Sequence, residues 1–224
     1  YERNWKGEHP HTAVTEHLDQ AAKLSWPKLL KAHVKDYQSL YKRVEIDLGE
    51  SSEAQLSLPV DQRLQAIRNG VADPERDALL FQYGRYLLIA SSRPGTLPAN
   101  LQGLWNGDYL SNINLQMNYW HAESANLAEC HTPLLNLLAE SLEPFRKATR
   151  LSFGENIRGS TVRTSHNPFG GMGWKWNIPA SAWYAQHFWE HYAFGQDKEY
   201  LRTVAYPYLK EVCQYWEDHL KMLP

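Results

Sequence analysis

Amide and indole side chains are unusually dense between residues 100 and 121. Asparagines and glutamines are interleaved there with tryptophans, and Asn112 and Asn114 stand two residues apart. In an extended segment this spacing would point both carboxamides the same way. A carboxamide offers two donors and an acceptor, which suits sugar hydroxyls or a positioned water. The alternative interpretation is that these amides order the loop by bonding to its backbone.

Aromatic and polar side chains in or next to the predicted loops are candidate sugar contacts. Indole faces stack on the C–H faces of sugars, but they also fill helical cores, and the chain has 9 Trp. The candidates for substrate binding are Trp105, Trp120, His121, His166, Asn167, Trp174 and Trp176. Trp183 and His187 lie on a predicted amphipathic helix, where packing in the core is the favoured interpretation.

Two carboxylates, Glu123 and Glu129, follow the asparagine pair closely. Either could serve as a catalytic acid, because a carboxylic acid can protonate a leaving group. A position on a helix surface or at a helix cap is the favoured interpretation for both.

A zinc-dependent peptidase is a remote alternative. His187, Glu190 and His191 form an H-x-x-E-H pattern, in which histidines four apart share a helical face and a glutamate can activate water. Such a site needs a third ligand, and no acidic motif downstream supplies one. We therefore expect no metal and no organic cofactor.

The elements that would position these residues are mostly helices. Helix-start residues and apolar stripes predict helices over residues 25–41, 61–70, 73–90, 132–154, 179–194 and 197–220, the last kinked or divided at Pro207. Val44–Leu48 alternates and reads as a short extended piece. Residues 91–100 and 154–173 read as loops rich in Pro or Gly. The predicted fold class is all-α, with six or seven helices and little sheet.

Composition excludes several classes of function. Lys+Arg 23 against Asp+Glu 25 gives a net charge of −2, so there is no basic excess for nucleic acid or an anionic membrane. No apolar run approaches the ~18 residues of a membrane span, so no membrane insertion is expected. The cysteines, Cys130 and Cys213, make neither a disulfide framework nor a zinc quartet.

Several long segments closely resemble the catalytic domain of glycoside hydrolase family 95. They are Phe81–Gly95, Leu97–Gly103, Asn112–Asn114 with Met117–Trp120, and Gln186–Tyr192, with further matches from His33 to Tyr206-Pro207. Members of this family are mainly α-L-fucosidases specific for the 1,2 linkage, with some α-L-galactosidases. The resemblance covers nearly the whole chain.

The resemblance implies a mechanism. It implies an (α/α)6 barrel and hydrolysis with inversion, which needs an acid for the leaving oxygen and a base that activates water on the opposite face. In the family, two asparagine carboxamides polarised by an aspartate hold the water, and a glutamate is the acid. Asn112 and Asn114 match the asparagine pair. No Ser-Pro-Glu or Asp-Gly-Asn segment is present, so the acid and base carboxylates are expected outside this chain.

The expected role of the chain follows from its length. Twelve barrel helices need roughly 350 residues, so residues 1–224 are expected to be part of one catalytic domain, incomplete on the C-terminal side. The expected function is release of terminal α-L-fucose (1,2-linked), or a closely related L-sugar, from oligosaccharides or glycans. The resemblance also suggests export to the periplasm or cell exterior. A non-catalytic carbohydrate-binding helical module is the alternative.

Overall fold

The computed structural model describes residues 9–104 and 107–220, and most of these residues are helical. The helices are α1 (Pro10–Ala22), α2 (Trp26–Tyr41), α3 (Glu53–Leu56), α4 (Val60–Arg68), α5 (Pro74–Ser91), α6 (Asn114–Tyr119), α7 (Ala128–Glu140), α8 (Leu142–Phe153), α9 (Ile178–Gly195), α10 (Lys198–Tyr200) and α11 (Tyr206–His219). A π-helical turn, η1 (Leu201–Ala205), joins α10 to α11, and the strands are β1 (Tyr109–Leu110), β2 (Arg163–His166) and β3 (Met172–Trp176). The predicted all-α class is confirmed.

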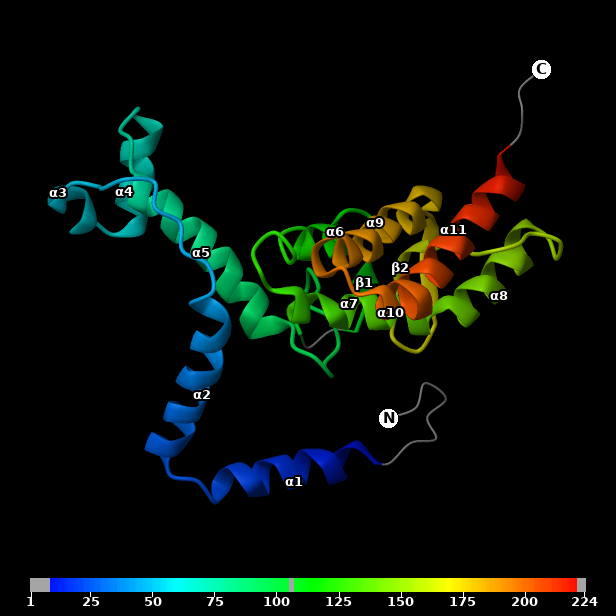
Figure 1. Ribbon diagram of the computed structural model, residues 1–224, viewed down its shortest axis with the longest axis horizontal. Coiled ribbons are helices and arrows are strands. Elements are labelled where there is room, and N and C mark those ends of the chain that lie inside the picture. The colour runs from blue at the N-terminus through cyan, green and yellow to red at the C-terminus, as the bar shows by residue number, and fades with distance from the viewer. Residues whose placement is uncertain (1–8, 105–106, 221–224) are drawn as a thin grey trace.

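The chain divides into a packed body and an arm (Figure 1). The body holds α6–α11 and the strands, while the arm is α1–α4, and α5 runs between the two. Leu40 is the one buried apolar residue that the described part of the arm contributes, and α1 exposes Val14 and Leu18. No described helix is long and apolar enough to cross a membrane.

The core lies in the body, where α5–α9 and α11 bring apolar side chains together. Its largest fully buried aromatic residues are Tyr109, Tyr119, Phe145, Tyr184, Phe188, Tyr208 and Tyr215. The rings of Phe188 and Tyr208 stack with centroids 4.0 Å apart, which fixes α11 on α9.

A buried arginine fastens the arm to the body. Arg85 of α5 is wholly buried, and its guanidinium donates to the carbonyls of Leu40 at 2.9 Å and Tyr41 at 2.7 Å, in the last turn of α2. Its Nε also donates to the carbonyl of Ala125 at 3.2 Å, in the turn before α7. The carbonyls of Leu40 and Tyr41 lie at the C-terminus of α2, which carries the negative end of the helix dipole. One side chain therefore holds α2, α5 and that turn together.

The small sheet stands beside the helices of the body. Among the described residues it is antiparallel in the order β1-β2-β3, with Tyr109 opposite His166 and Arg163 opposite Trp176. The loop predicted over residues 154–173 is therefore wrong in part, because it contains β2 and the start of β3. The side chain of Asn167 accepts from the backbone N–H of Gly171 and so shapes the turn between these strands.

The helix predicted over residues 132–154 is wrong in its start and its continuity. The structure has α7 from Ala128, a break at Ser141, and then α8. Pro133 lies inside α7 and cannot donate to the carbonyl of Glu129, and the Thr132 hydroxyl takes that carbonyl instead at 2.9 Å. A proline that looks like a helix start is thus accommodated within the helix.

Other boundaries agree more closely with the sequence. The helices predicted at 25–41, 73–90 and 179–194 correspond to α2, α5 and α9 within one or two residues. Pro207 lies in the first turn of α11, directly after η1, where a kink or division was predicted. Val44–Leu48 pairs with no strand of the described structure.

Candidate active site

The two asparagines sit on a strained turn rather than on an extended segment. Ile113 between them has φ 75° and ψ −42°, close to a γ-turn that β-branched residues rarely adopt. Asn112 is exposed, and Asn114 is half-buried as the first residue of α6. Neither carboxamide makes a hydrogen bond to any residue that the structure describes. Strain of this kind costs about 1–3 kcal/mol and is concentrated at functional sites.

The body holds this turn from beneath. Buried Ser111 donates its backbone N–H to the carbonyl of Thr164 in β2, at 2.7 Å. The carbonyl of Ser111 accepts from the side chains of Gln116, at 2.7 Å, and Asn177, at 3.2 Å. The turn is therefore fixed by β2, by α6 itself and by the residue that precedes α9.

An exposed apolar stripe runs along α6 next to Asn114. Ile113, Met117 and Trp120 are 49%, 49% and 48% exposed, and their spacing places them on one side of the helix. The ring of Trp120 meets that of Trp183 edge-on, with centroids 5.9 Å apart. The stripe offers an apolar surface beside two carboxamides that bond to no described residue, an arrangement suited to a sugar ring.

His121 lies just beyond the other end of α6. It lines an open groove of about 360 Å³ between α5 and α6, together with Asn100, Asn118 and Met117 of the apolar stripe. Burial lowers its pKa below the ordinary value of 6.5, and its buried Nε2 has no partner among the described atoms. Asn112 and Asn114 do not line this groove.

The remaining predicted sugar contacts differ widely in exposure. His166 is wholly buried, and Asn167 shapes the turn between β2 and β3. Trp174 is 70% exposed, whereas Trp176 is half-buried beneath the guanidinium of Arg163 at 4.7 Å. Trp105 lies outside the described residues. Trp120 and Trp174 are thus the predicted contacts that present large apolar surface to solvent.

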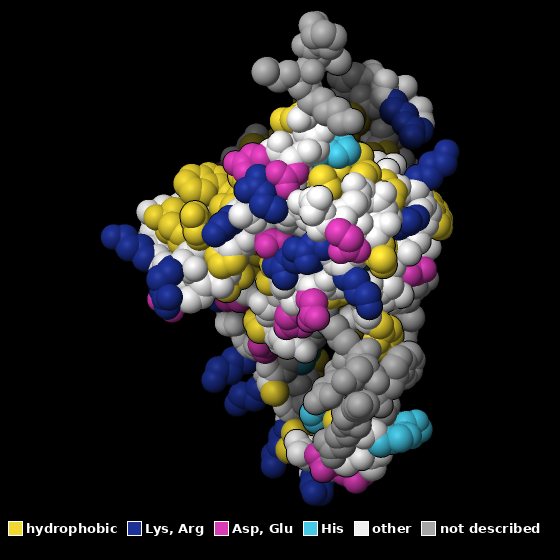
Figure 2. Space-filling view, turned by 90° about the vertical axis from the view of Figure 1, so that its right-hand side faces the viewer, with side chains coloured by type: hydrophobic (Ala, Val, Ile, Leu, Met, Phe, Trp, Pro, Cys, Tyr) yellow, Lys and Arg dark blue, Asp and Glu magenta, His cyan; other side chains and the backbone are white. Residues whose placement is uncertain are grey.

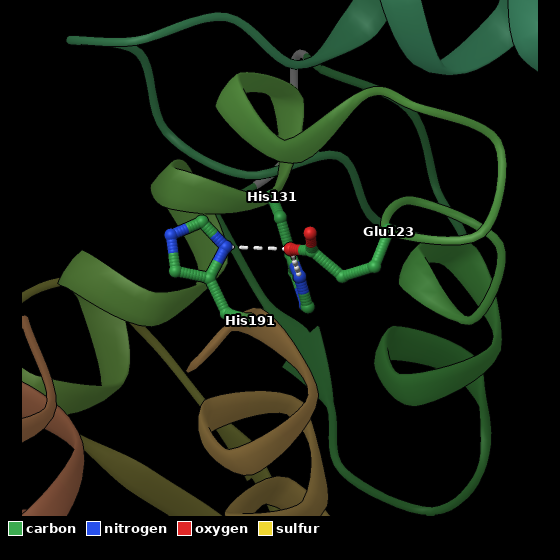
Figure 3. Close-up of side chains that lie close together, drawn as sticks. All are labelled: Glu123, His131 and His191. Carbon is green, nitrogen blue, oxygen red and sulfur yellow. Dashed lines mark hydrogen bonds and ion pairs between the residues drawn. The ribbon is translucent and has the colours of Figure 1, made fainter. Parts of the chain in front are cut away.

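A cluster of buried and half-buried ionisable side chains surrounds Glu123, in the turn between α6 and α7 (Figure 3). Oε1 of Glu123 is 2.7 Å from Nδ1 of His131, on α7, and 2.5 Å from Nδ1 of His191, on α9. Nε2 of His131 in turn lies 2.9 Å from Nδ1 of His187. The sequence pattern alone singled out Glu123, His187 and His191 for other reasons and missed His131. The signal that could have found it was the position of His131 within the mostly apolar sequence of α7.

Electrostatics argue against Glu123 and Glu129 as catalytic acids. Burial alone would raise the pKa of Glu123, but hydrogen bonds from His131 and His191 outweigh it and bring the pKa to about 2. Burial is likewise outweighed at Glu129 by its hydrogen bond with Arg43, and its pKa is lowered. A general acid needs a proton near neutral pH, so two ionised carboxylates cannot fill that role.

The zinc site of the remote peptidase alternative, His187, Glu190 and His191, has no matching geometry in the described residues. The group whose donor atoms gather within 4.8 Å is Glu123, His131 and His191, without His187 or Glu190. Zinc bonds of 2.0–2.1 Å in a tetrahedron would separate ligand atoms by about 3.3 Å. Contacts of 2.7 and 2.5 Å instead suit shared protons.

The comparison with known families agrees with the resemblance in the sequence. Residues 25–224 match the model of the glycosyl hydrolase family 95 catalytic domain. The chain belongs to this family. The mostly helical body and arm are consistent with an all-α portion of the family's helical barrel. The match begins after α1, and residues 1–224 as one domain stay a prediction.

The curated relatives that are similar to this chain are named as fucosidases. "Probable alpha-fucosidase A" of Aspergillus niger is 38% identical over 231 residues, covering 97% of this chain and 29% of the relative. "Alpha-L-fucosidase 2" of Arabidopsis thaliana is 35% identical over 228 residues, covering 94% of this chain and 27% of the relative. The family 95 chain thus spans less than a third of the length of these curated relatives.

Proposed function

We propose that this family 95 chain belongs to an inverting glycosidase that releases terminal α-L-fucose (1,2-linked), or a closely related L-sugar, from oligosaccharides. The observation that carries the proposal is the strained turn that presents the Asn112 and Asn114 carboxamides without a hydrogen bond to any described residue. The names of the curated relatives support the sugar.

Both asparagines hold the attacking water in this proposal. The side-chain carbonyls of Asn112 and Asn114 accept hydrogen bonds from the attacking water and orient its lone pair toward the anomeric carbon. Glu123 and Glu129 are held ionised by their partners, so the leaving-group acid is a carboxylic acid from outside this chain. The family resemblance also supports a polarising base that is a carboxylate outside this chain. The stripe of Ile113, Met117 and Trp120 packs against the C–H face of the glycan.

Replacing the second asparagine tests this assignment. In the full-length gene product, Asn114→Ala should lower kcat on an α-1,2-fucosylated trisaccharide by about 10²-fold, as for the loss of one preorganised group. Asn156→Ala, which removes an exposed carboxamide in the turn after α8, is the matched control and should leave kcat unchanged. Near-normal turnover of Asn114→Ala would reject the assignment.

Stereochemistry and the leaving sugar are tested in one proton NMR time course. Inversion requires that the first-formed product be the β-anomer of L-fucose. An α-anomer formed first would reject inversion. Sugar binding without any turnover, unaffected by replacing Asn112 or Asn114, would favour the non-catalytic carbohydrate-binding module. Comparing fucosyl with L-galactosyl substrates assigns the sugar.

We also propose that the protein is exported, on the strength of the family resemblance. Fractionation of the producing cells tests this, and recovery of the protein with the cytosol alone would reject it.

A further inference from the structure

The turn between α6 and α7 carries a carboxylate that the proposed chemistry does not use. Glu123 is 6% exposed, and its neighbours Ala122, Ala125 and Leu127 are buried. Arg and Lys side chains do not pair with it anywhere in the described chain. Its partners are His131 and His191, which reach it from two different helices. The position of this turn therefore depends on where α7 and α9 place two imidazoles.

One assignment of protons satisfies every contact in the cluster. If His131, His187 and His191 each carry hydrogen on Nδ1, then Glu123 accepts from His131 and His191, and Nε2 of His131 accepts from His187. Burial and the neighbouring His131 lower the pKa of His187 to about 3, which agrees with a neutral ring. Both N–H groups must aim at one oxygen atom, so the cluster fixes direction as well as distance.

The cluster is joined to α6 through its last residue. Tyr119 stacks on His131 with ring centroids 5.7 Å apart and an interplanar angle of 14°. Its hydroxyl lies 2.6 Å from that of Ser92 and accepts from the backbone N–H of Ala99 at 2.7 Å. Helix α6 has 6 residues, with Asn114 at its start and Tyr119 at its end. Because Asn114 and Tyr119 are the two ends of one short helix, we expect a displacement of Tyr119 to displace Asn114 as well.

We propose that Glu123 is a positioning residue that sets Asn114 and Trp120 by holding the turn after α6 against α7 and α9. This inference rests on the proposed function for its effect on turnover, but its geometric part does not. Burial of an ionised carboxylate contributes little net stability, because desolvation offsets the attraction of its partners. Its contribution is the fixed orientation of the imidazoles around one oxygen.

Two variants weaken or remove the contact in different ways. Glu123→Gln can keep an oxygen in the place of Oε1, but it replaces a charged acceptor with a neutral one and so weakens both hydrogen bonds from the imidazoles. His191→Phe keeps an aromatic ring beside Tyr200, whose centroid is 4.6 Å away, and removes only the N–H. The matched control is Asp73→Asn, another buried carboxylate, which pairs with Arg63 between α4 and α5 at 2.6 Å. The second variant decides the question if Glu123→Gln does not fold.

Hydrogen exchange measures the positioning without any need for turnover. In the full-length gene product, mass spectrometry of peptides covering residues 114–127 should show exchange about 10-fold faster in Glu123→Gln and His191→Phe than in wild type. Asp73→Asn should leave these peptides unchanged. Unchanged exchange in both cluster variants, or the same acceleration in Asp73→Asn, would overturn the positioning role.

Kinetics measures the consequence for the site. Displacing Asn114 should lower kcat about 10-fold, because the attacking water is misplaced, and displacing Trp120 should also raise KM, because one sugar contact shifts. A fall in thermal stability with unchanged kcat would show a structural role only and would reject the proposal. A wild-type protein that fails to cleave fucosides would reject the proposed function alone, since hydrogen exchange still decides whether Glu123 positions α6.

Discussion

At the scale of single residues, burial separates side chains that the sequence makes look alike. His121, His166 and Trp174 all lie near predicted loops and are all equally plausible sugar contacts by type. The structure leaves Trp174 mostly in solvent and buries His166 completely. Residue type and loop position therefore singled out the asparagine pair as candidates but could not rank the aromatic residues near it. That ranking depends on contacts between distant elements.

The burial of His166 has a consequence for stability against pH. Desolvation lowers the pKa of this imidazole to about 3, so it is neutral in the folded protein. The unfolded chain takes up a proton below about pH 6.5, so folding stability is lost as pH falls from about 6.5 toward 3, by about 1.4 kcal/mol per pH unit. His166→Phe should remove this dependence, because the ring still packs against Tyr109 and Phe145.

Urea unfolding between about pH 4 and 7 measures this effect. The slope of unfolding free energy against pH should fall by about one proton in His166→Phe. His17→Phe, on the exposed surface of α1, is the control and should keep the wild-type slope. Equal slopes in wild type and His166→Phe would show that His166 is protonated in the folded protein.

At the scale of elements, the sequence predicted what local chemistry determines. Asp73 caps α5 as expected, since its carboxylate accepts from the N–H of Arg76 and Pro74 follows it. The break between α7 and α8 was missed although Ser141 and Pro144 are typical of a helix start, and the Ser141 hydroxyl donates back to the carbonyl of Leu137 instead of capping α8. The cluster of Glu123, His131 and His191 could not be predicted from the sequence either. Glu123 and His191 are 68 residues apart and meet only when α9 packs on α7.

The segment between α8 and β2 contacts helix α11, and this contact depends on a single glycine. Gly159 has φ +66°, and a Cβ there would lie 2.0 Å from the carbonyl oxygen of Glu211 and 2.7 Å from the backbone nitrogen of Tyr215. Gly159→Ala should therefore cost about 2–4 kcal/mol of unfolding free energy, from overpacking and backbone strain. Gly195→Ala, with no described atom within 4 Å of the added Cβ, should be nearly neutral. Chemical denaturation of both variants decides, and equal losses would contradict the close approach.

At the scale of the whole molecule, acidic and basic side chains are mixed on the face that Figure 2 shows. In the body, Arg158 pairs with Asp218 at 2.6 Å and Arg146 with Glu211 at 2.8 Å. This mixture agrees with the small net charge of −2 and with a neutral substrate.

The attachment of the arm to the body can be loosened at one residue. Arg85→Lys keeps the charge, but an ammonium cannot reach the carbonyls of Leu40, Tyr41 and Ala125 at once, because its donors radiate from one atom. Limited proteolysis should then cut residues 42–52 about 10-fold faster. Arg76→Lys, at a half-buried site that pairs with Asp77 on the same helix, should not change the cleavage rate. Equal cleavage rates in Arg85→Lys and wild type would contradict the role of Arg85 as the fastening.

The π-helical turn before α11 gives this part of the chain an unusual tolerance of length. A π turn is what remains when one extra residue enters an α-helix, because the wider loop absorbs the residue without rotating the flanking turns. Ala205, the last residue of the turn, is wholly buried. Pro207 lies in the first turn of α11, where a residue without a backbone N–H is tolerated. Insertions and deletions of one residue among the descendants of this gene should therefore accumulate at Leu201–Ala205, while α9 and α11 keep their spacing intact.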